Sequence, residues 1–172
     1  MKKPNIVNIE KIIPDAYHGT SAKNAKNICQ EGFRPSEGEQ YLGDGVYFYE
    51  AAMSHAENWA RKQFKGEPIG VLKSTINLGR CLDLHVKEHQ ELANFVAEKL
   101  RKRGKWAITD AVVINFIASN FLPIDSVKAT YVSSKTTKRV FDGSRFYSHS
   151  RLIICVRNLK NILKVSLVCT SL

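Results

Sequence analysis

Residues 15–33 read DAYHGTSAKNAKNICQEGF, and the character of this stretch changes in its middle. Up to His18 it has the mixed apolar pattern of a strand end. From Ser21 onward apolar residues recur at helical spacing, with Thr20 or Ser21 available as the N-cap. Gly32 then ends the helix as a C′ glycine. The stretch therefore predicts a strand, a His-Gly-Thr junction and a helix.

A second unusual stretch follows at residues 41–50, YLGDGVYFYE. Two glycines flank a tight loop, and the residues after it predict a short strand. Strand alternation places Tyr47 and Tyr49 on one face and Phe48 on the other, toward the core. The two tyrosines could pack the edge of the core, or they could form a platform for a planar or cationic ring.

The His-Gly-Thr junction has a structural and a functional interpretation. Gly19 has no Cβ and would let a ligand approach the backbone closely. His18 offers a ring nitrogen as a hydrogen-bond donor to a hydroxyl, and Thr20 can cap the helix or bind a ligand. Alternatively, the histidine is satisfied within a turn and binds nothing.

The rest of the chain contains helices and strands that do not alternate regularly. Helices are expected over residues 51–62 and 86–101, and strands over 71–84 with a turn at Gly79-Arg80, 126–132 and 151–168. Residues 6–13 form an edge strand or a lead-in. The apolar run 111–118 is ambiguous by pattern alone, and Asp110 could cap it as a buried helix. Irregular alternation argues against parallel βαβ winding. We therefore expect an α+β fold with mostly antiparallel strands, in a single domain spanning residues 1–172.

The chain is strongly basic. It has 172 residues, 26 Lys and Arg, 16 Asp and Glu, and a net charge of +10. Such an excess favours a polyanionic partner. The charge gathers at residues 99–105 and 135–139, with a thinner series through Arg145, Arg151, Arg157 and Lys160.

The four cysteines, at positions 29, 81, 155 and 169, form no CxxC pair, and no histidine stands at ligand spacing from them. We therefore expect neither a metal site nor a disulfide framework. No apolar stretch approaches the roughly 20 residues that span a bilayer, and the N-terminus lacks the apolar core of a signal peptide. These features predict a cytoplasmic protein without a membrane partner.

Taken together, the two stretches resemble a known family. The order is His-Gly-Thr at a strand end, a helix ending in EGF, a glycine-flanked GVYF, and a helix carrying ENWA. It resembles the ADP-ribosyltransferase superfamily, in the poly-ADP-ribose-polymerase-like, diphtheria-toxin-related branch with a His-Tyr-x signature. The resemblance implies a split antiparallel β-sandwich with flanking helices, and NAD+ as co-substrate.

The resemblance also assigns residues. His18 matches the histidine that binds the adenosine-side ribose, the Gly19 backbone would hold the nicotinamide amide, and Tyr47 would stack on the nicotinamide ring. The further cofactor contacts implied are Thr20, Ser54 and Trp59, the last near the second aromatic wall.

The third signature position departs from the family pattern. A glutamate often stands there, but here the place falls on Ile153, or on Leu152 if the register slips. Neither side chain can carry charge. Family members with an aliphatic residue at this position resemble mono-ADP-ribosyltransferases, which add one unit and do not elongate chains.

The sequence therefore predicts a mono-ADP-ribosyltransferase that modifies a macromolecule, with nucleic acid slightly favoured over protein as acceptor. The small size suggests a bacterial or phage-defence toxin, with an antitoxin or immunity protein as a possible partner. Two alternatives stay open: a non-catalytic module that binds NAD+ or ADP-ribose, and an NAD-dependent RNA 2′-phosphotransferase that would use Arg34, Arg145 or Arg151.

Overall fold

A computed structural model describes residues 8–36, 41–104, 107–132, 138–139, 142, 147–148 and 150–171. Parts of the segments that entered the predictions above lie outside these residues, namely 6–7, 105, 135–137 and 145.

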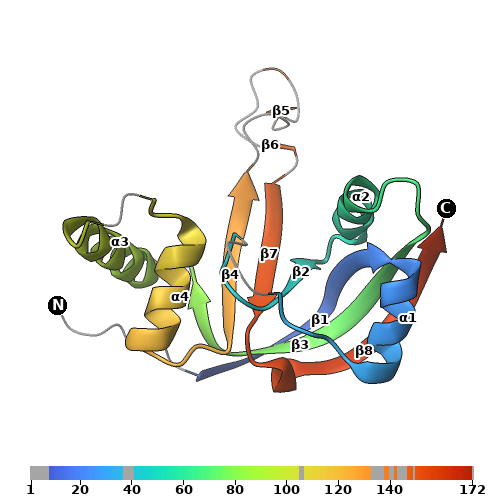
Figure 1. The fold of residues 1–172 in the computed structure, drawn as a ribbon, viewed down its shortest axis with the longest axis horizontal. Helices are drawn as coiled ribbons and strands as arrows, with labels where there is room; N and C mark the ends of the chain where they lie inside the picture. Colours follow the sequence, from blue (N-terminus) through green and yellow to red (C-terminus); the bar gives the residue numbers. More distant parts are fainter. Residues whose placement is uncertain are drawn as a thin grey trace.

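Four helices flank a strand framework in the described part of the chain (Figure 1). They are α1 (Ala22–Glu31), α2 (Met53–Gln63), α3 (Lys87–Lys102) and α4 (Asp110–Asn120). The strands are β1 (Asn8–Ser21), β2 (Val46–Glu50), β3 (Ile69–Asp83), β4 (Ser126–Val132), β5 (Lys138–Arg139), β6 (Tyr147–Ser148), β7 (Ser150–Val156) and β8 (Ile162–Ser171). A short 3-10 turn, Leu159–Asn161, separates β7 from β8. The expected α+β class is confirmed.

The sheet consists of two halves that share β1 and β3. The strand order is β1-β2-β7-β4-β3-β8, and β1 additionally pairs with β3. One half therefore contains β1, β3 and β8. The other contains β2, β7 and β4, and it joins the first half through the pairing of β2 with β1 and of β4 with the end of β3. All these pairings are antiparallel except that of β3 with β4. This is the split, mostly antiparallel arrangement that the sequence predicts.

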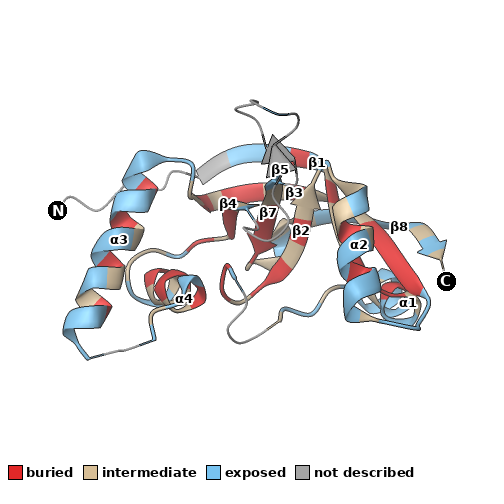
Figure 2. Cartoon of the chain, turned by 90° about the horizontal axis from the view of Figure 1, so that it is seen from above, coloured by how far each residue is buried: buried red, intermediate tan, exposed pale blue. Residues whose placement is uncertain are grey.

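Within the described residues, three apolar clusters hold the layers together. The largest lies between α3 and α4 and the strands β4 and β7, and a second fills the space between the two half-sheets. The third packs Ala56 and Ala60 of α2 onto Ile69 and Val71 of β3. Figure 2 shows the helices in two pairs at opposite ends of the molecule, with the buried faces of α3 and α4 turned toward the strands.

The helix boundaries follow local chemistry. Ser21 caps α1, because its hydroxyl accepts a hydrogen bond from the Asn24 amide at 3.2 Å. Gly32 ends α1 with φ of +86°, a conformation that glycine adopts without strain. Thr109, one residue before the expected Asp110, caps α4 by accepting from the Val112 amide at 3.3 Å. No described helix is both long and apolar enough to cross a membrane.

The predicted turn at Gly79-Arg80 is wrong. Strand β3 continues through both residues and pairs there with the start of β1. Gly79 has a φ of +57°, and a Cβ at this position would lie 2.8 Å from a carboxylate oxygen of Asp125. The glycine therefore marks an irregularity inside a long strand, where a neighbouring side chain occupies the space of its missing Cβ.

Candidate active site

His18 stands where the two half-sheets separate. In the described strands, β1 pairs with β2 at Ala16↔Glu50 and Tyr17↔Tyr49, and beyond these positions β1 continues along β3 while β2 continues along β7. His18 is the first residue past the branch. Its Nδ1 lies 2.8 Å from the Tyr47 carbonyl oxygen, so a side chain bridges the two strands where their ladder stops.

The surroundings of His18 fix its protonation and its tautomer. The ring meets Phe33 edge-on at 5.2 Å between centroids and lies 5.8 Å from the Phe48 ring. Burial lowers the pKa of His18, and the bond to the Tyr47 carbonyl opposes this only in part. A carbonyl can only accept, so Nδ1 carries the proton and the neutral ring has its lone pair on Nε2. His18 therefore offers a hydrogen-bond acceptor, where the sequence analysis expected a donor.

Tyr47 is held at its hydroxyl end. The hydroxyl donates to the Gly43 carbonyl at 2.6 Å and accepts from the Leu42 amide at 2.8 Å. Burial raises the pKa of Tyr47 far above its ordinary value of 10.0, so the phenol stays neutral. Asn115 secures the same loop, because its Oδ1 accepts from the Asp44 amide at 3.0 Å. The loop before β2 and the Tyr47 ring therefore form one rigid unit.

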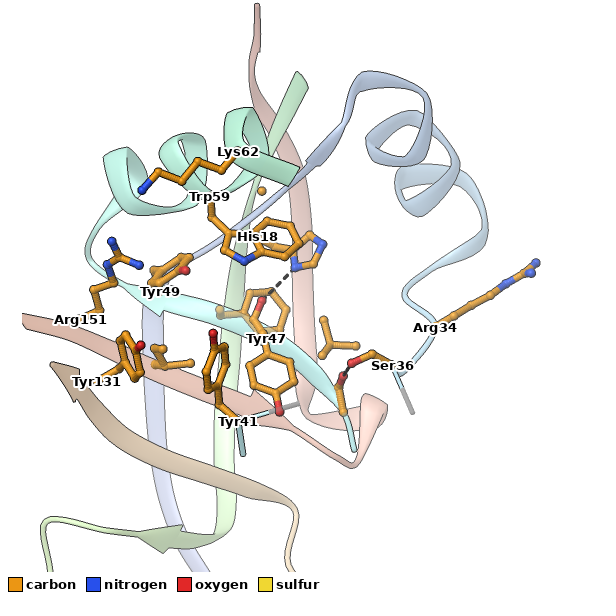
Figure 3. A pocket seen from close by; sticks show the side chains of 15 residues that line it. His18, Arg34, Ser36, Tyr41, Tyr47, Tyr49, Trp59, Lys62, Tyr131 and Arg151 are labelled. Atoms are coloured by element: carbon orange, nitrogen blue, oxygen red, sulfur yellow. Dashed lines mark hydrogen bonds between the residues drawn. The ribbon is translucent and has the colours of Figure 1, made fainter. Parts of the chain in front are cut away.

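A cavity of about 330 Å³ opens between β2, β7 and α2 (Figure 3). Its volume lies in the range of small-ligand sites. Of the residues predicted from sequence, it brings together His18, Gly19, Tyr47, Trp59 and Ile153. Thr20 is buried and lines a different hollow, and Ser54 is exposed on α2. The cofactor contacts predicted for these two residues remain predictions.

The remaining cavity walls are aromatic and basic. Tyr41, Tyr49 and Tyr131 contribute phenol rings, and the Tyr41 and Tyr131 rings lie 5.2 Å apart. The basic side chains lining the cavity are Arg34, Lys62 and Arg151. The sequence pointed to Tyr49 but not to Tyr41 or Tyr131. Tyr131 lies on β4, and the strand register that brings β4 beside β7 is not visible in local patterns.

Gly19 is required by the packing of α2. A Cβ built on Gly19 would collide with the carbonyl oxygen of Ala56 and come within 2.7 Å of its carbonyl carbon. The close approach of α2, and not of a ligand, therefore explains why this residue has no Cβ. Gly19 still lines the cavity, so its small size serves the close approach of α2 and exposes its backbone to the site.

Ile153 lies on the cavity wall and is 7% exposed. It pairs with Tyr49 on one side and with Ala129 on the other. Strand alternation puts Arg151 on the same face as Ile153 and Leu152 on the opposite face. Among the described lining residues there is no carboxylate.

A second hollow of about 480 Å³ adjoins the first and shares Arg34 with it. It is lined by Thr20, Asn24, Asn27, Ile28, Glu31, Gly32 and Arg34. Most of these residues are polar, and Asn24, Asn27 and Glu31 lie on one face of α1. This hollow is not among the predictions from sequence. The spacing of Asn24, Asn27 and Glu31 in the predicted helix does indicate a polar face there.

Comparison with known proteins assigns this chain to a family. A family model described as the poly(ADP-ribose) polymerase catalytic domain matches residues 10–146, which is most of the chain. The chain therefore belongs to the poly(ADP-ribose) polymerase catalytic domain family, as the sequence resemblance predicts. Catalytic domains of this family use NAD+ as substrate, and their general activity is ADP-ribosyl transfer.

Two further similarities concern individual proteins. An uncharacterized protein of Methanocaldococcus jannaschii is 31% identical over 120 residues, which cover 60% of this chain and 56% of that protein. The chain thus matches only about half the length of this relative. The toxin–antitoxin complex MbcT–MbcA of M. tuberculosis contains a chain that is 13% identical, with a TM-score of 0.49 and coverage of 96% of this chain and 86% of that one.

The Tyr47 hydroxyl leads to a first prediction. Tyr47→Phe keeps the ring but leaves the Leu42 amide and the Gly43 carbonyl without this partner, so we expect a loss of about 1–3 kcal/mol in stability. The KM for NAD+ should rise several-fold because the loop loosens. Tyr47→Ala, which also removes the ring, should raise the KM far more. Urea unfolding and steady-state kinetics measure the two effects. Tyr17→Phe, outside the cavity, is the control, and equal destabilisation of both phenylalanine variants would contradict the prediction.

Proposed function

We propose that this protein transfers a single ADP-ribose unit from NAD+ to a macromolecular acceptor. The observation that carries the proposal is the convergence of His18, Gly19 and Tyr47 on one cavity at the branch between the half-sheets. These residues come from two strands that are far apart in sequence. Tyr47 supplies an aromatic ring, Gly19 supplies backbone that faces the cavity, and His18 supplies a nitrogen that can accept a hydrogen bond from a hydroxyl.

In this proposal the two hollows hold the two ends of the dinucleotide. The cationic nicotinamide lies against Tyr47, where attraction to an aromatic face contributes about 0.5–2 kcal/mol. Its carboxamide meets the Gly19 backbone, and a ribose hydroxyl donates to Nε2 of His18. The polar hollow beside α1 receives the adenosine end. Holding both ends strains the glycosidic bond, which breaks with its electron pair leaving on nicotinamide, and the acceptor then bonds to the anomeric carbon.

Two features support transfer of one unit to a nucleic acid. The aliphatic Ile153 occupies the third signature position, which favours single transfer over chain elongation. The net charge of +10 favours a polyanionic acceptor. An antitoxin or immunity partner remains a prediction from the sequence.

The transfer proposal is tested with labelled NAD+ and total RNA, DNA and protein. We expect label that survives protease and disappears with nuclease. Protease-sensitive label would overturn the nucleic-acid acceptor but keep the transferase. Absence of NAD+ binding in a calorimetric titration would overturn both.

A non-catalytic NAD+-binding module is the second candidate, and Ile153 is the observation that favours it. This candidate predicts NAD+ binding without nicotinamide release, whichever acceptor is supplied. Release of nicotinamide by wild-type protein, absent in His18→Ala, would eliminate it.

Ile153→Glu tests the third signature position directly. The carboxylate would face the cavity and stabilise positive charge at the anomeric carbon, so we expect NAD+ hydrolysis to rise about tenfold or more, since electrostatic stabilisers of this kind are worth on the order of 10²–10³ in rate. Nicotinamide release measures the effect. Ile153→Gln controls for size, and Leu152→Glu, on the opposite face of β7, controls for charge. Equal rates for Ile153→Glu and Leu152→Glu would contradict the assignment.

A further inference from the structure

The end of the cavity near Ile153 is cationic. Figure 3 shows Lys62 and Arg151 at this end and Arg34 at the other. Arg34 is exposed and paired with Glu31 at 2.9 Å, so its charge is already compensated. Lys62 comes from α2 and Arg151 from β7, and both side chains line the cavity. Where the family often presents a carboxylate, this chain presents positive charge.

The side chain of Arg151 is held in place, but not all of its N–H groups have a hydrogen-bond partner among the described residues. It is partly buried, pairs in register with Tyr131, and its guanidinium lies beside the phenol of Tyr49. Its Nε is buried and has no hydrogen-bond partner among the described residues. A buried N–H without a partner is unfavourable unless a ligand supplies the acceptor. A guanidinium fixed in this way is suited to an oxyanion, which it can bind through two parallel N–H groups.

The described cavity walls also lack a base for the acceptor. Hydroxyl and amine acceptors must lose a proton when they bond to the anomeric carbon, and a carboxylate usually takes it. None of the described lining residues is a carboxylate, and in the proposed function the lone pair of His18 is occupied by the ribose. An acceptor that arrives already ionised needs no base, and its own charge offsets the developing positive centre.

The rim next to Arg151 is aromatic and open. Tyr41 and Trp59 are 57% and 39% exposed, and Tyr41 lies against Tyr131. Such rings can stack a nucleobase. A guanidinium beside stacking rings matches a phosphate with a base attached to it. We infer that the acceptor is a terminal phosphate of a nucleic acid, held by Arg151 and Lys62 beside Ile153; this inference rests on the proposed function.

The reaction balances without a further reactant. An oxygen of the terminal phosphomonoester, which is largely a dianion at neutral pH, supplies the electron pair for the new bond to the anomeric carbon of the ribose. The bond from that carbon to the nicotinamide nitrogen breaks, and its electron pair leaves on neutral nicotinamide. The products are nicotinamide and a nucleic acid whose terminal phosphate has become a phosphodiester to ADP-ribose.

The test uses the full chain, labelled NAD+ and oligonucleotides of one sequence with a 5′-phosphate, a 3′-phosphate or hydroxyls at both ends. A peptide rich in Asp and Glu supplies carboxylates as the competing acceptor. We expect transfer to at least one phosphorylated oligonucleotide, at least tenfold faster than to the hydroxyl oligonucleotide or the peptide. Phosphatase treatment of the oligonucleotide before the reaction should abolish labelling.

Arg151→Gln should lower kcat/KM for the phosphorylated oligonucleotide by about tenfold to hundredfold, the size expected for charge-assisted hydrogen bonds, and Arg151→Lys should lower it less. Arg101→Gln removes an equal charge from the exposed surface of α3 and is the control. Thermal melting verifies that each variant folds. Equal losses in the Arg151→Gln and Arg101→Gln variants would overturn the role of Arg151.

Preferred transfer to hydroxyl ends or to the carboxylate peptide would overturn the phosphate acceptor and leave the proposed transferase in place. Failure of wild-type protein to bind NAD+ would instead overturn the proposed function itself.

Discussion

Gly19→Ala is expected to destabilise the fold by about 3 kcal/mol and to abolish NAD+ binding together with it. The added methyl would meet the backbone of Ala56, which lies in α2 and cannot rotate away as a side chain would. Strand β1 and α2 must therefore separate, and the cavity between them loses its shape. Urea unfolding gives the change in stability, and a calorimetric titration gives the loss of binding.

Gly66→Ala is the matched control for the Gly19 prediction. Gly66 has a φ of +80°, and no atom of the described residues lies within 4 Å of the position that an added Cβ would take, so only backbone strain opposes the change. That strain costs about 1–2 kcal/mol. Gly66→Ala should lower stability by this smaller amount and leave NAD+ affinity unchanged. If Gly19→Ala cost no more than Gly66→Ala, close packing of α2 would not explain the glycine.

His18→Ala is expected to lower kcat/KM for NAD+ by about 10²–10³-fold, the cost typical of removing one fixed polar group from an active site. The change removes the Nε2 acceptor and also the Nδ1–H bond that ties β1 to the Tyr47 carbonyl. Nicotinamide release measures the effect. His85→Ala is the control, because His85 is bound to Asp83 and Thr130 and does not line the cavity.

The pH dependence of His18 follows from its lowered pKa. Nε2 can accept a hydrogen bond only while the ring is neutral, and burial keeps the ring neutral below its ordinary pKa of 6.5. NAD+ binding should therefore stay constant as the pH falls from 8 through 6.5 and decline only at lower pH. A decline centred at or above pH 6.5 would show that the ring is not buried in the working protein.

Local patterns predicted the elements around the site well. The His-Gly-Thr junction, the helix ending at Gly32 and the alternation of Tyr47 and Phe48 are all properties of neighbouring residues, and all are confirmed. Of the two residues considered for the third signature position, Ile153 lines the cavity and Leu152 does not, and the role of Ile153 in that position stays a prediction.

Long-range contacts explain what the sequence did not reveal. The loop before Tyr47 is held by Asn115, which is far away in sequence, and the role of Arg151 depends on Tyr131 and Tyr49 from two other strands. The expected turn at Gly79 is wrong for the same reason. The glycine is explained by the side chain of Asp125, distant in sequence, which occupies the space that a Cβ on residue 79 would need. The donor role expected for His18 changed because a carbonyl on another strand fixes the tautomer.

The sharing of β1 and β3 between the half-sheets also bears on how the protein is made. His18 is synthesised before the strand β7, which carries Ile153, and before the strand β8, which pairs with β3. A nascent chain can form the His-Gly-Thr junction but has no opposite wall on which to hold a dinucleotide. We therefore expect NAD+ binding to appear only after β7 has been made and has paired with β2.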